Sequence, residues 1–396
     1  MEVKIERLSD TGEGIGIINN KVIFIPKSVI GDVVLVKDIK EYKKYLTGNI
    51  DKIITKSNDR CSIDCPYFSY CGGCQIMNIS YDKQLLYKKN KVINMFKKYA
   101  DIEINPEIIG TSIFNYRNKI ILEVSNGKLG LYEYRSHNII NISECLLVND
   151  NINDIIRLIN EKIDLSFVKK VMIKISTEDL VMVSFYGEIK NEDIELLKDS
   201  VSSIYVNDEL IYGDKDFIVK LNSYSFYVSN NSFFQVNYEQ MIRLYDKVYE
   251  YLPSNGNVMD LYCGTGSIGI YVSDKCKSVL GVEINKDAYE DAVRNKELNK
   301  INNIEFKCGD VEDIIKDSDS FDSIIVDPPR AGLSVKTRDI LLNIGSKNII
   351  YVSCDPMTLA RDVKYLSDKY YVKDITLFDM FPNTYHIESL MVLERK

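Results

Sequence analysis

Short apolar segments separated by polar turns fill the first 57 residues of the chain. VKIERL, GIGII, KVIFIP and VVLVKDI are runs of strand length, and turns rich in Asp, Gly and Asn stand at 10–14 and 19–20. Short strands separated by turns this closely spaced are typical of a small β-barrel. We therefore expect an OB-like barrel over residues 1–57.

Residues 58–230 mix strand-like and helix-like apolar patterns. A cysteine-rich loop comes first, and apolar residues then recur at helical spacing near 80–100. Further along, the strand-like segments KIILEVS, KVMIKIS, LVMVSFYG and SFYVS accompany the helix-like segment NINDIIRLINEKI. The mixture predicts a central α+β domain over 58–230, with the helix near 80–100 as a candidate to pack on the next domain.

From 231 to 396 the pattern changes to regular alternation of strand and helix. The strand-like segments VMDLY, SVLGVEI, IEFKC, FDSIIVDPP, KNIIYVSC and SLMVLER are separated mostly by helix-like ones. Such alternation builds right-handed βαβ units in a mostly parallel sheet covered on both faces, so we expect a Rossmann-like α/β domain over 231–396. Ligands of such sheets bind at the carboxyl ends of the strands.

Composition and net charge limit the classes of binding partner that the chain can have. The 396 residues are 45% hydrophobic and 27% charged, as in soluble globular proteins, and no apolar run approaches the roughly 18 residues of a membrane span. The first residues, MEVKIERLSD, lack the layout of a signal peptide, so we expect a cytoplasmic protein without membrane partners. A net charge of −8 argues against coating nucleic acid by bulk electrostatics.

Any contact with nucleic acid must therefore be local. The segment 83–98 contains six lysines and no acid, while Leu85, Val92 and Phe96 recur at helical spacing. It is a candidate RNA contact, and a solvated basic helix face is an equally good interpretation. The lysines are Lys83, Lys88, Lys89, Lys91, Lys97 and Lys98.

One strand of the last domain ends in a glycine turn. Gly264 and Gly266 let the backbone turn sharply and approach a ligand, although a tight strand-helix turn needs the same residues. Glu283 ends the next strand, where a carboxylate can accept the two hydroxyls of a ribose, and Asp310 follows the third, where it could accept from an adenine amino group. Because the full G-x-G-x-x-G pattern is absent, S-adenosylmethionine is favoured over a dinucleotide.

Two further strand ends carry reactive groups. Asp327 is followed by two prolines that stop its strand, and Cys354 ends the next strand just before Asp355 and Pro356, a typical helix start. A thiol before a helix N-terminus tends towards thiolate, which the Asp355 carboxylate opposes. A single cysteine is more often a small buried hydrophobe, but this location favours a nucleophile.

Two residues near the final strand are candidates for acid-base work. His386 is one of two histidines, although a packed imidazole is the commoner case. Glu388, at the opening of an apolar strand, is the better candidate for a base because burial would raise its pKa.

Four of the nine cysteines crowd into residues 61–74. Without a secretion signal they should be reduced, which points to metal binding or catalysis before disulfides. The spacing C-x5-C-x2-C with a distant fourth cysteine suits structural zinc as well as an iron-sulfur cluster.

Taken together, these motifs resemble the RNA uracil-5-methyltransferase family. The resemblance is to the branch that acts on 23S ribosomal RNA and carries a TRAM domain and an iron-sulfur cluster, and it covers essentially the whole chain. It rests on GEGIGIINNKVIFIPKSVIGDVVLV, CPYFSYCGGC, SECLLVN, NSFFQVN, DLYCGTGSIGI, DPPRAG, YVSCDPMTLARD and the terminal HIE.

The resemblance assigns roles residue by residue. It implies that Cys354 is the nucleophile, Glu388 the base and Phe233 a residue that stacks on an RNA base. The methyl-donor contacts that it implies are Gln235, Tyr262, Glu283 and Asp327, beside the glycine turn at Gly264 and Gly266. The ligands implied for a 4Fe-4S cluster are Cys65, Cys71, Cys74 and Cys145.

Three positions depart from the family pattern. Cys61 has no counterpart and is expected to be spare, with substitution for Cys65 as the alternative. Asp355 stands where Asn is frequent, which makes a thiolate costlier, and Ser267 stands where some members have Asn. Arg117 and Lys119 are candidate RNA phosphate contacts, with a plain surface strand as the alternative.

The implied reaction is S-adenosylmethionine-dependent methylation of carbon 5 of a uridine by a monomeric enzyme. The expected substrate is 23S ribosomal RNA, with transfer RNA as the alternative. Two rivals remain: a methyltransferase acting on amino groups of protein or DNA, which needs no cysteine, and a catalytically silent RNA-binding assembly factor.

Overall fold

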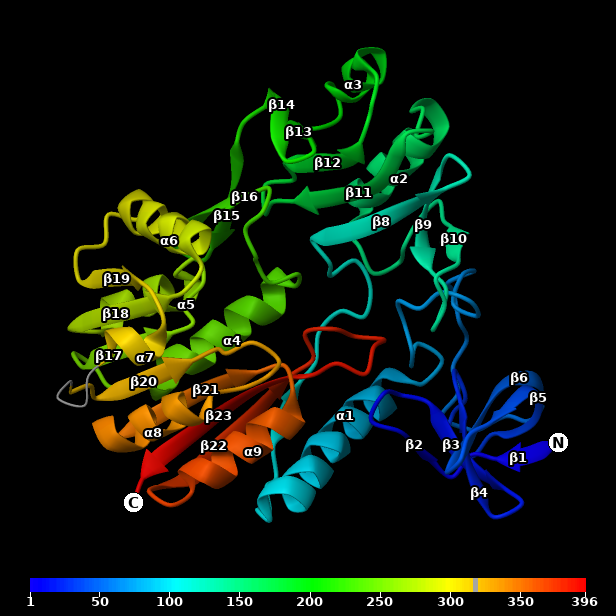
Figure 1. Cartoon of the computed structure of the whole chain (residues 1–396), viewed down its shortest axis with the longest axis horizontal. Helices are drawn as coiled ribbons and strands as arrows, with labels where there is room; N and C mark the ends of the chain where they lie inside the picture. Colours follow the sequence, from blue (N-terminus) through cyan, green and yellow to red (C-terminus); the bar gives the residue numbers. More distant parts are fainter. Residues whose placement is uncertain (316–319) are drawn as a thin grey trace.

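The N-terminal residues form a strongly curved six-stranded sheet. A computed structural model describes residues 1–315 and 320–396, and Figure 1 draws the chain from blue to red. The strands follow the order β1-β5-β6-β4-β3-β2, and inward-facing side chains such as Ile5, Ile23 and Val34 form its core. These strands are β1 (Glu2–Lys4), β2 (Arg7–Leu8), β3 (Gly14–Ile18), β4 (Lys21–Ile25), β5 (Val33–Glu41) and β6 (Tyr45–Thr55). The predicted strand-rich N-terminal unit is confirmed.

The central sheet has seven strands in the order β10-β9-β8-β11-β12-β13-β14. Helix α2 presents Ile152, Ile155, Ile156 and Ile159 to it, the spacing of one helix face. Its elements are β8 (Lys119–Ser125), β9 (Lys128–Tyr132), β10 (Ile139–Asn141), α2 (Asp150–Lys162), β11 (Val168–Ile175), β12 (Val181–Gly187), α3 (Asn191–Leu197), β13 (Ser203–Val206) and β14 (Glu209–Gly213).

The C-terminal sheet has the order β19-β18-β17-β20-β21-β23-β22-β7. Strands β17 to β21 are parallel, and β23 runs antiparallel beside β21. Because the chain proceeds outward in one direction from β17 and in the other from β20, the carboxyl ends of these two strands flank a topological switch point. The strands are β7 (Glu107–Ile109), β17 (Asn257–Leu261), β18 (Ser278–Glu283), β19 (Ile304–Cys308), β20 (Ser323–Val326), β21 (Asn348–Ser353), β22 (Tyr370–Phe378) and β23 (Glu388–Arg395).

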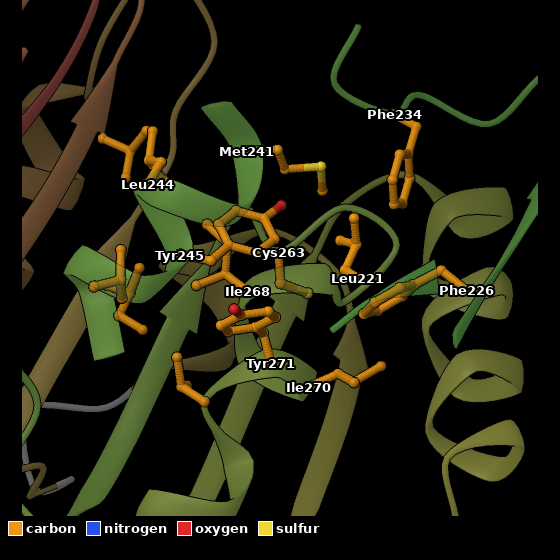
Figure 2. Close-up of a cluster of buried hydrophobic side chains, with 14 of the residues drawn as sticks. Leu221, Phe226, Phe234, Met241, Leu244, Tyr245, Cys263, Ile268, Ile270 and Tyr271 are labelled. Carbon is orange, nitrogen blue, oxygen red and sulfur yellow. The ribbon is translucent and has the colours of Figure 1, made fainter. Parts of the chain in front are cut away.

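Helices and one hairpin cover both faces of this sheet. On one face, Met241 and Tyr245 of α4 pack with Ile268 of α5 and with Leu221 and Phe226 of the hairpin β15-β16 (Figure 2). The covering elements are β15 (Asp216–Leu221), β16 (Tyr224–Ser229), α4 (Tyr238–Tyr251), α5 (Ser267–Tyr271), η2 (Ser273–Lys275), α6 (Lys286–Leu298), α7 (Val311–Ile314), α8 (Val335–Ile344) and α9 (Pro356–Leu366).

The basic helix belongs to the same packing unit. Helix α1 (Tyr81–Met95) and a π-helical turn, η1 (Phe96–Ala100), lie against α9 and bury Val92 and Phe96 in the core of the C-terminal sheet. Strand β7 then adds to the edge of that sheet, parallel to β22. Segments 81–109 and 216–229 therefore pack with the C-terminal domain. The sequence pattern placed both within residues 58–230 and offered only the helix near 80–100 as a candidate for this packing. Among the described residues, no helix is both long enough and apolar enough to cross a bilayer.

Candidate active site

The turn after β17 contains two glycines, Gly264 and Gly266, with different structural roles. Both have positive φ, 54° at Gly264 and 76° at Gly266, a conformation that glycine adopts without strain. A Cβ on Gly266 would lie 2.5 Å from Phe306 Cζ, so Gly266 is required by packing. Among the described residues, a Cβ on Gly264 would meet no atom within 4 Å and would project into open space. Gly264 therefore leaves room for a ligand against the backbone.

Acidic residues surround this turn. Glu283 accepts the Gly264 N–H at 2.9 Å and the Asn285 N–H at 2.8 Å, and its oxygens keep lone pairs for a ligand. Asp310, exposed after β19, caps α7 by accepting the Glu312 N–H at 2.9 Å. Tyr262, in the left-handed region at φ 61°, lies 3.3 Å from Thr337 through its hydroxyl.

Two carboxyl groups, the buried Asp260 and the half-buried Asp327, lie beneath the same turn. Asp260 accepts the Gly269 N–H at 3.0 Å through Oδ2, while its Oδ1 has no partner in the described structure. Burial, and then the neighbouring Asp327, raises the pKa of Asp260 to about 8. Burial also raises the pKa of Asp327 to about 7. An orphaned buried oxygen and two acids suit a cationic ligand above the sheet, because a positive charge would stabilise their ionised forms.

Cys354 and Glu388 face each other across two neighbouring strands. Ser353 pairs with Ser389 in the antiparallel register of β21 and β23, so the next pair in that register is Cys354 and Glu388. Glu388 is 3% exposed, and burial, followed by Asp327, raises its pKa well above the usual range. The sequence predicted this direction from the apolar strand that Glu388 opens.

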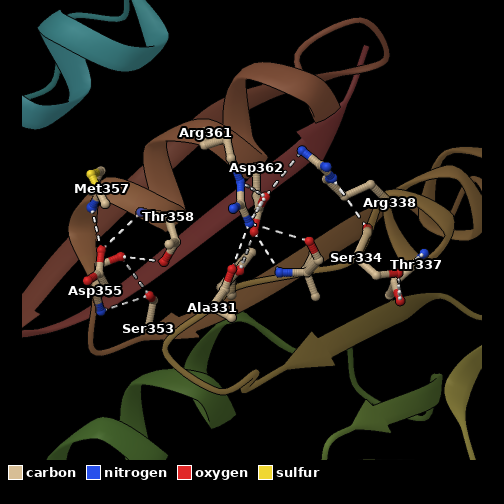
Figure 3. Close-up of polar contacts among 12 residues, drawn as sticks. Ala331, Ser334, Thr337, Arg338, Ser353, Asp355, Met357, Thr358, Arg361 and Asp362 are labelled. Atoms are coloured by element: carbon tan, nitrogen blue, oxygen red, sulfur yellow. Dashed lines mark hydrogen bonds and ion pairs between the residues drawn. The ribbon is translucent and has the colours of Figure 1, made fainter.

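The prediction that Cys354 tends towards thiolate is wrong. Burial, followed by the charge of Glu388, raises the pKa of Cys354 to about 11, and Arg330 only partly opposes this. The expected helix start is confirmed, since Asp355 caps α9 by accepting the Met357 and Thr358 N–H groups at 2.9 and 3.0 Å (Figure 3). Desolvation and the surrounding acids outweigh the helix terminus.

A second carboxylate fixes the loop that follows Asp327. Asp362 accepts the Leu333 N–H at 2.8 Å and the Tyr351 hydroxyl at 2.9 Å. Arg361 and Arg338 neutralise it at 2.9 and 3.4 Å. Through these contacts Asp362 connects the loop to α9 and β21, the two elements that flank Cys354.

His386 lies in an aromatic environment. Its ring is 4.2 Å from that of Tyr385 and 5.9 Å from that of Phe381. Burial, then the nearby Arg330 and Lys91, lowers its pKa to about 4. The imidazole is therefore neutral at neutral pH, which agrees with the packed interpretation rather than with a proton donor.

The four cysteines singled out by the resemblance share one cavity of about 340 Å³. Cys61 does not line it, and its Sγ instead contacts the Met77 carbonyl at 3.3 Å. Within the described residues, no three His, Cys, Asp or Glu side chains converge closely enough to hold a single metal ion. The cavity-lining cysteines are Cys65, Cys71, Cys74 and Cys145.

The loop before α4 borders the same cavity. Phe233 is 73% exposed there, and Gln235 is fixed through its carbonyl, which accepts from Asn118 Nδ2 at 2.9 Å. Arg117 and Lys119 also line the cavity, and the buried Nε of Arg117 has no partner in the described part of the chain.

The basic helix is less available to RNA than its sequence suggests. Lys88 is fully buried and contacts Asp379, and Lys91 donates to the Tyr385 carbonyl at 3.1 Å. Lys97 and Lys98 at its end are exposed. A helix-wide RNA contact through all six lysines is therefore wrong, because two of them hold the segment that leads to Glu388.

Three family models match the chain. The TRAM domain model matches residues 1–50, the methyltransferase small domain model 244–344 and the tRNA (uracil-5-)-methyltransferase model 305–396. A protein of Staphylococcus aureus (strain MRSA252) described as an uncharacterized RNA methyltransferase is 34% identical, over 98% of this chain and 96% of the relative. One of Halalkalibacterium halodurans with the same description is 35% identical, over 100% and 97%.

The chain belongs to the RNA uracil-5-methyltransferase family. The methyltransferase is also similar, with TM-score 0.82 and 28% identity, to the crystal structure of Pyrococcus abyssi tRNA (uracil-54, C5)-methyltransferase in complex with S-adenosyl-L-homocysteine. The match covers 99% of this chain and 100% of the other. The fold is thus that of an α/β methyltransferase dependent on S-adenosylmethionine, with an N-terminal TRAM domain.

Sequence reasoning missed several groups around the methyltransferase's reacting site. Arg330 lies close enough to Cys354 and Glu388 to oppose in part the rise that burial causes in the pKa of both, and Asp260 lies under the glycine turn. Their signal was present in DPPR and VMDLYCG, where each adjoins a residue that was singled out. Lys88 and Asp379 carried no such signal, because their pairing is a tertiary contact.

Proposed function

We propose that this methyltransferase transfers a methyl group to carbon 5 of a uridine in RNA through a covalent Cys354-uracil intermediate. The juxtaposition of Cys354 and Glu388 in neighbouring strands carries the proposal. Direct transfer to an amino group needs no thiol, whereas carbon 5 of uracil is a poor nucleophile until carbon 6 is attacked. A silent assembly factor would have no use for this pair.

The proposed steps use the two side chains in sequence. The Cys354 proton passes to solvent, and the thiolate bonds to carbon 6 while the π electrons of the C5–C6 bond move to O4 as an enolate. S-adenosylmethionine, when bound, supplies an electrophilic methyl group on a sulfonium. Carbon 5 takes the methyl group as the bond from that group to the sulfonium sulfur breaks, with S-adenosylhomocysteine as the leaving group. Glu388 then accepts the carbon 5 proton, the double bond re-forms and the thiolate leaves.

The residues around the glycine turn fit the methyl donor. Gly264 leaves space at the backbone, and Glu283 keeps acceptor capacity for ribose hydroxyls. We assign Asp310 to the adenine, and Gln235, Tyr262 and Asp327 to the remainder of the donor. Gly266 supports this site by packing rather than by contact.

The four-cysteine cavity supports a 4Fe-4S cluster in this proposal. Thiolates around one zinc ion would each lie about 2.3 Å from it, and no such convergence occurs among the described residues. The four cysteines line one largely apolar cavity, where their thiolates would hold the iron of a cluster. Lys27 donates to the Cys71 carbonyl at 2.7 Å, which would bring an ammonium group beside thiolate ligands once these had formed.

The substrate proposed first is 23S ribosomal RNA, on the resemblance of the cysteine segments. Transfer RNA is the second candidate, because the similar P. abyssi enzyme is a tRNA (uracil-54, C5)-methyltransferase. Phe233, exposed at the cavity, would stack on a base of either RNA. RNA from a strain that lacks the gene should regain 5-methyluridine on incubation with the protein and the donor. Mass spectrometry of nucleosides would refute the proposal if methyl groups appeared only on other atoms, or not at all.

A further inference from the structure

Three chain segments enclose a hollow next to the segment that leads into Glu388. They are the first turn of the barrel, the cysteine loop at 72–75 and the hairpin turn between β9 and β10. Tyr385, three residues before Glu388, also lines the hollow, whose volume is about 740 Å³. We call it the flanking groove.

Aromatic side chains dominate the hairpin wall of the flanking groove. Tyr132 is 46% exposed, and its ring lies 6.5 Å from that of His137 at 89°, so the two rings meet edge to face. The Arg135 guanidinium lies over the Tyr134 ring, with its central carbon 5.4 Å from the ring centroid. These rings line a space open to solvent rather than a core.

Arg135 adds a positive charge at the tip of the turn. Its φ is 54°, a left-handed conformation that costs an arginine free energy that glycine would avoid. It donates to Glu13 at 2.9 Å, and its side chain is 56% exposed, which leaves other guanidinium donors facing solvent. The two acids near Arg135 already have partners within the protein. Glu13 accepts from Arg135, and Glu133 accepts from Asn138 Nδ2 at 3.1 Å.

We propose that the flanking groove binds unstacked nucleotides next to the target uridine, with a base stacked on Tyr132 and a phosphate held by Arg135. This inference rests on the proposed function. A uridine that enters the reacting site must leave its helix, and its neighbours in the strand then lose their stacking partners. Aromatic faces combined with arginine are what single-stranded RNA selects. Tyr385 makes the groove continuous with the segment that carries Glu388.

The test uses variants that should fold. Tyr132→Ala removes an exposed ring. Arg135→Gly removes the charge and relieves the strained backbone but leaves the buried Glu13 without its cation, so the double variant Arg135→Gly with Glu13→Gln is measured beside it. Tyr371→Ala is the matched control, because Tyr371 on β22 is also 46% exposed and lies outside the groove. Two RNAs are compared: one carries the uridine that the parent enzyme methylates with its natural neighbours, and in the other those neighbours are abasic.

The expected results separate the two contacts. Tyr132→Ala should weaken binding and raise KM for the natural RNA about 10-fold, the effect of one lost base stack, and should leave the abasic RNA, kcat and donor affinity unchanged. Arg135→Gly should weaken binding of both RNAs and reduce the salt dependence by about one phosphate contact. Tyr371→Ala should match the parent.

The failures of the two proposals are distinguishable. If the parent enzyme methylates the RNA at carbon 5 and both groove variants bind it as the parent does, the groove assignment is overturned and the proposed function stands. If the parent enzyme modifies no uridine in any RNA, the proposed function fails and the occupant of the groove fails with it.

Discussion

Lys88 Nζ lies 2.5 Å from Asp379 Oδ1, and both side chains are fully buried. The same ammonium donates to the Phe381 carbonyl at 3.0 Å, while Asp379 Oδ2 has no partner in the described structure. This ion pair joins α1 to the segment between β22 and β23, and so to the strand that Glu388 opens. Asn383 adds a second joint, since its N–H donates to Gln84 Oε1 at 2.9 Å.

Breaking this pair on one side should be costly. Lys88→Met leaves the Asp379 carboxylate buried without a cation, which is expected to destabilise the protein by about 3 to 5 kcal/mol. The midpoint of urea unfolding measures the loss. Lys88→Met combined with Asp379→Leu should recover most of it, because neither charge is then left uncompensated. A single variant as stable as the parent would contradict the buried pair.

Gly264 can be tested against a matched glycine. Gly264 and Gly127 have φ of 54° and 68°, and a Cβ on either would meet no atom within 4 Å in the part of the chain that the structure describes. Alanine at either position should cost about 1 kcal/mol of stability through backbone strain. Only Gly264→Ala should also weaken binding of S-adenosylmethionine, by about 10-fold, because its methyl group would occupy ligand space. Calorimetry that gave equal donor affinities for both variants would move the ligand away from this turn.

The order of the chemistry predicts a trapped intermediate. Glu388→Gln cannot remove the carbon 5 proton, so RNA should stay covalently attached to Cys354 and contain a methyl group from the donor. Denaturing electrophoresis with a labelled donor detects this adduct. Cys354→Ala should give none, and the double variant should behave like Cys354→Ala because the earlier step is missing. Folded variants that bind RNA and never form the adduct would indicate direct transfer.

The raised pKa of Cys354 predicts how its reactivity depends on pH. Because the thiol is the stable form up to about pH 11, alkylation of Cys354 should be slow at neutral pH and accelerate roughly tenfold per pH unit below the pKa. Mass spectrometry of the Cys354 peptide gives the rate, with the exposed Cys308 as the internal reference for reagent. Above the pH at which Glu388 ionises, Glu388→Gln should alkylate faster, since the charge that opposes the thiolate is gone. Rapid alkylation at pH 6 would contradict the burial argument.

The cysteine cavity predicts a ligand pattern. Anaerobically purified protein should contain about four iron atoms per chain. Cys65→Ser, Cys71→Ser, Cys74→Ser and Cys145→Ser should each lose iron, whereas Cys61→Ser, the matched control outside the cavity, should retain it. Stoichiometric zinc without iron would refute the cluster.

The spacing of apolar residues and the turn residues predicted the elements whose formation depends on neighbouring positions in the sequence. The strands and helices after 231 follow from apolar periodicity and turn residues, and the cap at Asp355 follows from its position before Pro356. Strand β7 was not predicted, because three residues carry no periodicity and Ile109 meets Phe378 only in the folded sheet.

The site was predictable as a list of residues but not in its electrostatics. Motif positions identified Cys354, Glu388 and Asp327 as candidates, since all three lie at strand ends. Their pKa values depend on mutual distance and burial, and the sum of these effects reversed the expectation for the thiol. The pairing of Lys88 with Asp379 could not be predicted either, because the sequence shows only a lysine on a basic helix.

The pairing of α1 with the segment at 379 has a consequence for biosynthesis. Lys88 and Asp379 are separated by 291 positions in the chain, so α1 leaves the ribosome long before its ionic partner has been translated. Until then the Lys88 ammonium and the apolar side chains of Val92 and Phe96 have no complete surface to pack against, and the nascent chain exposes them to chaperones or to other chains. A chain released before residue 379 would therefore be a substrate for degradation, and it would also lack Glu388.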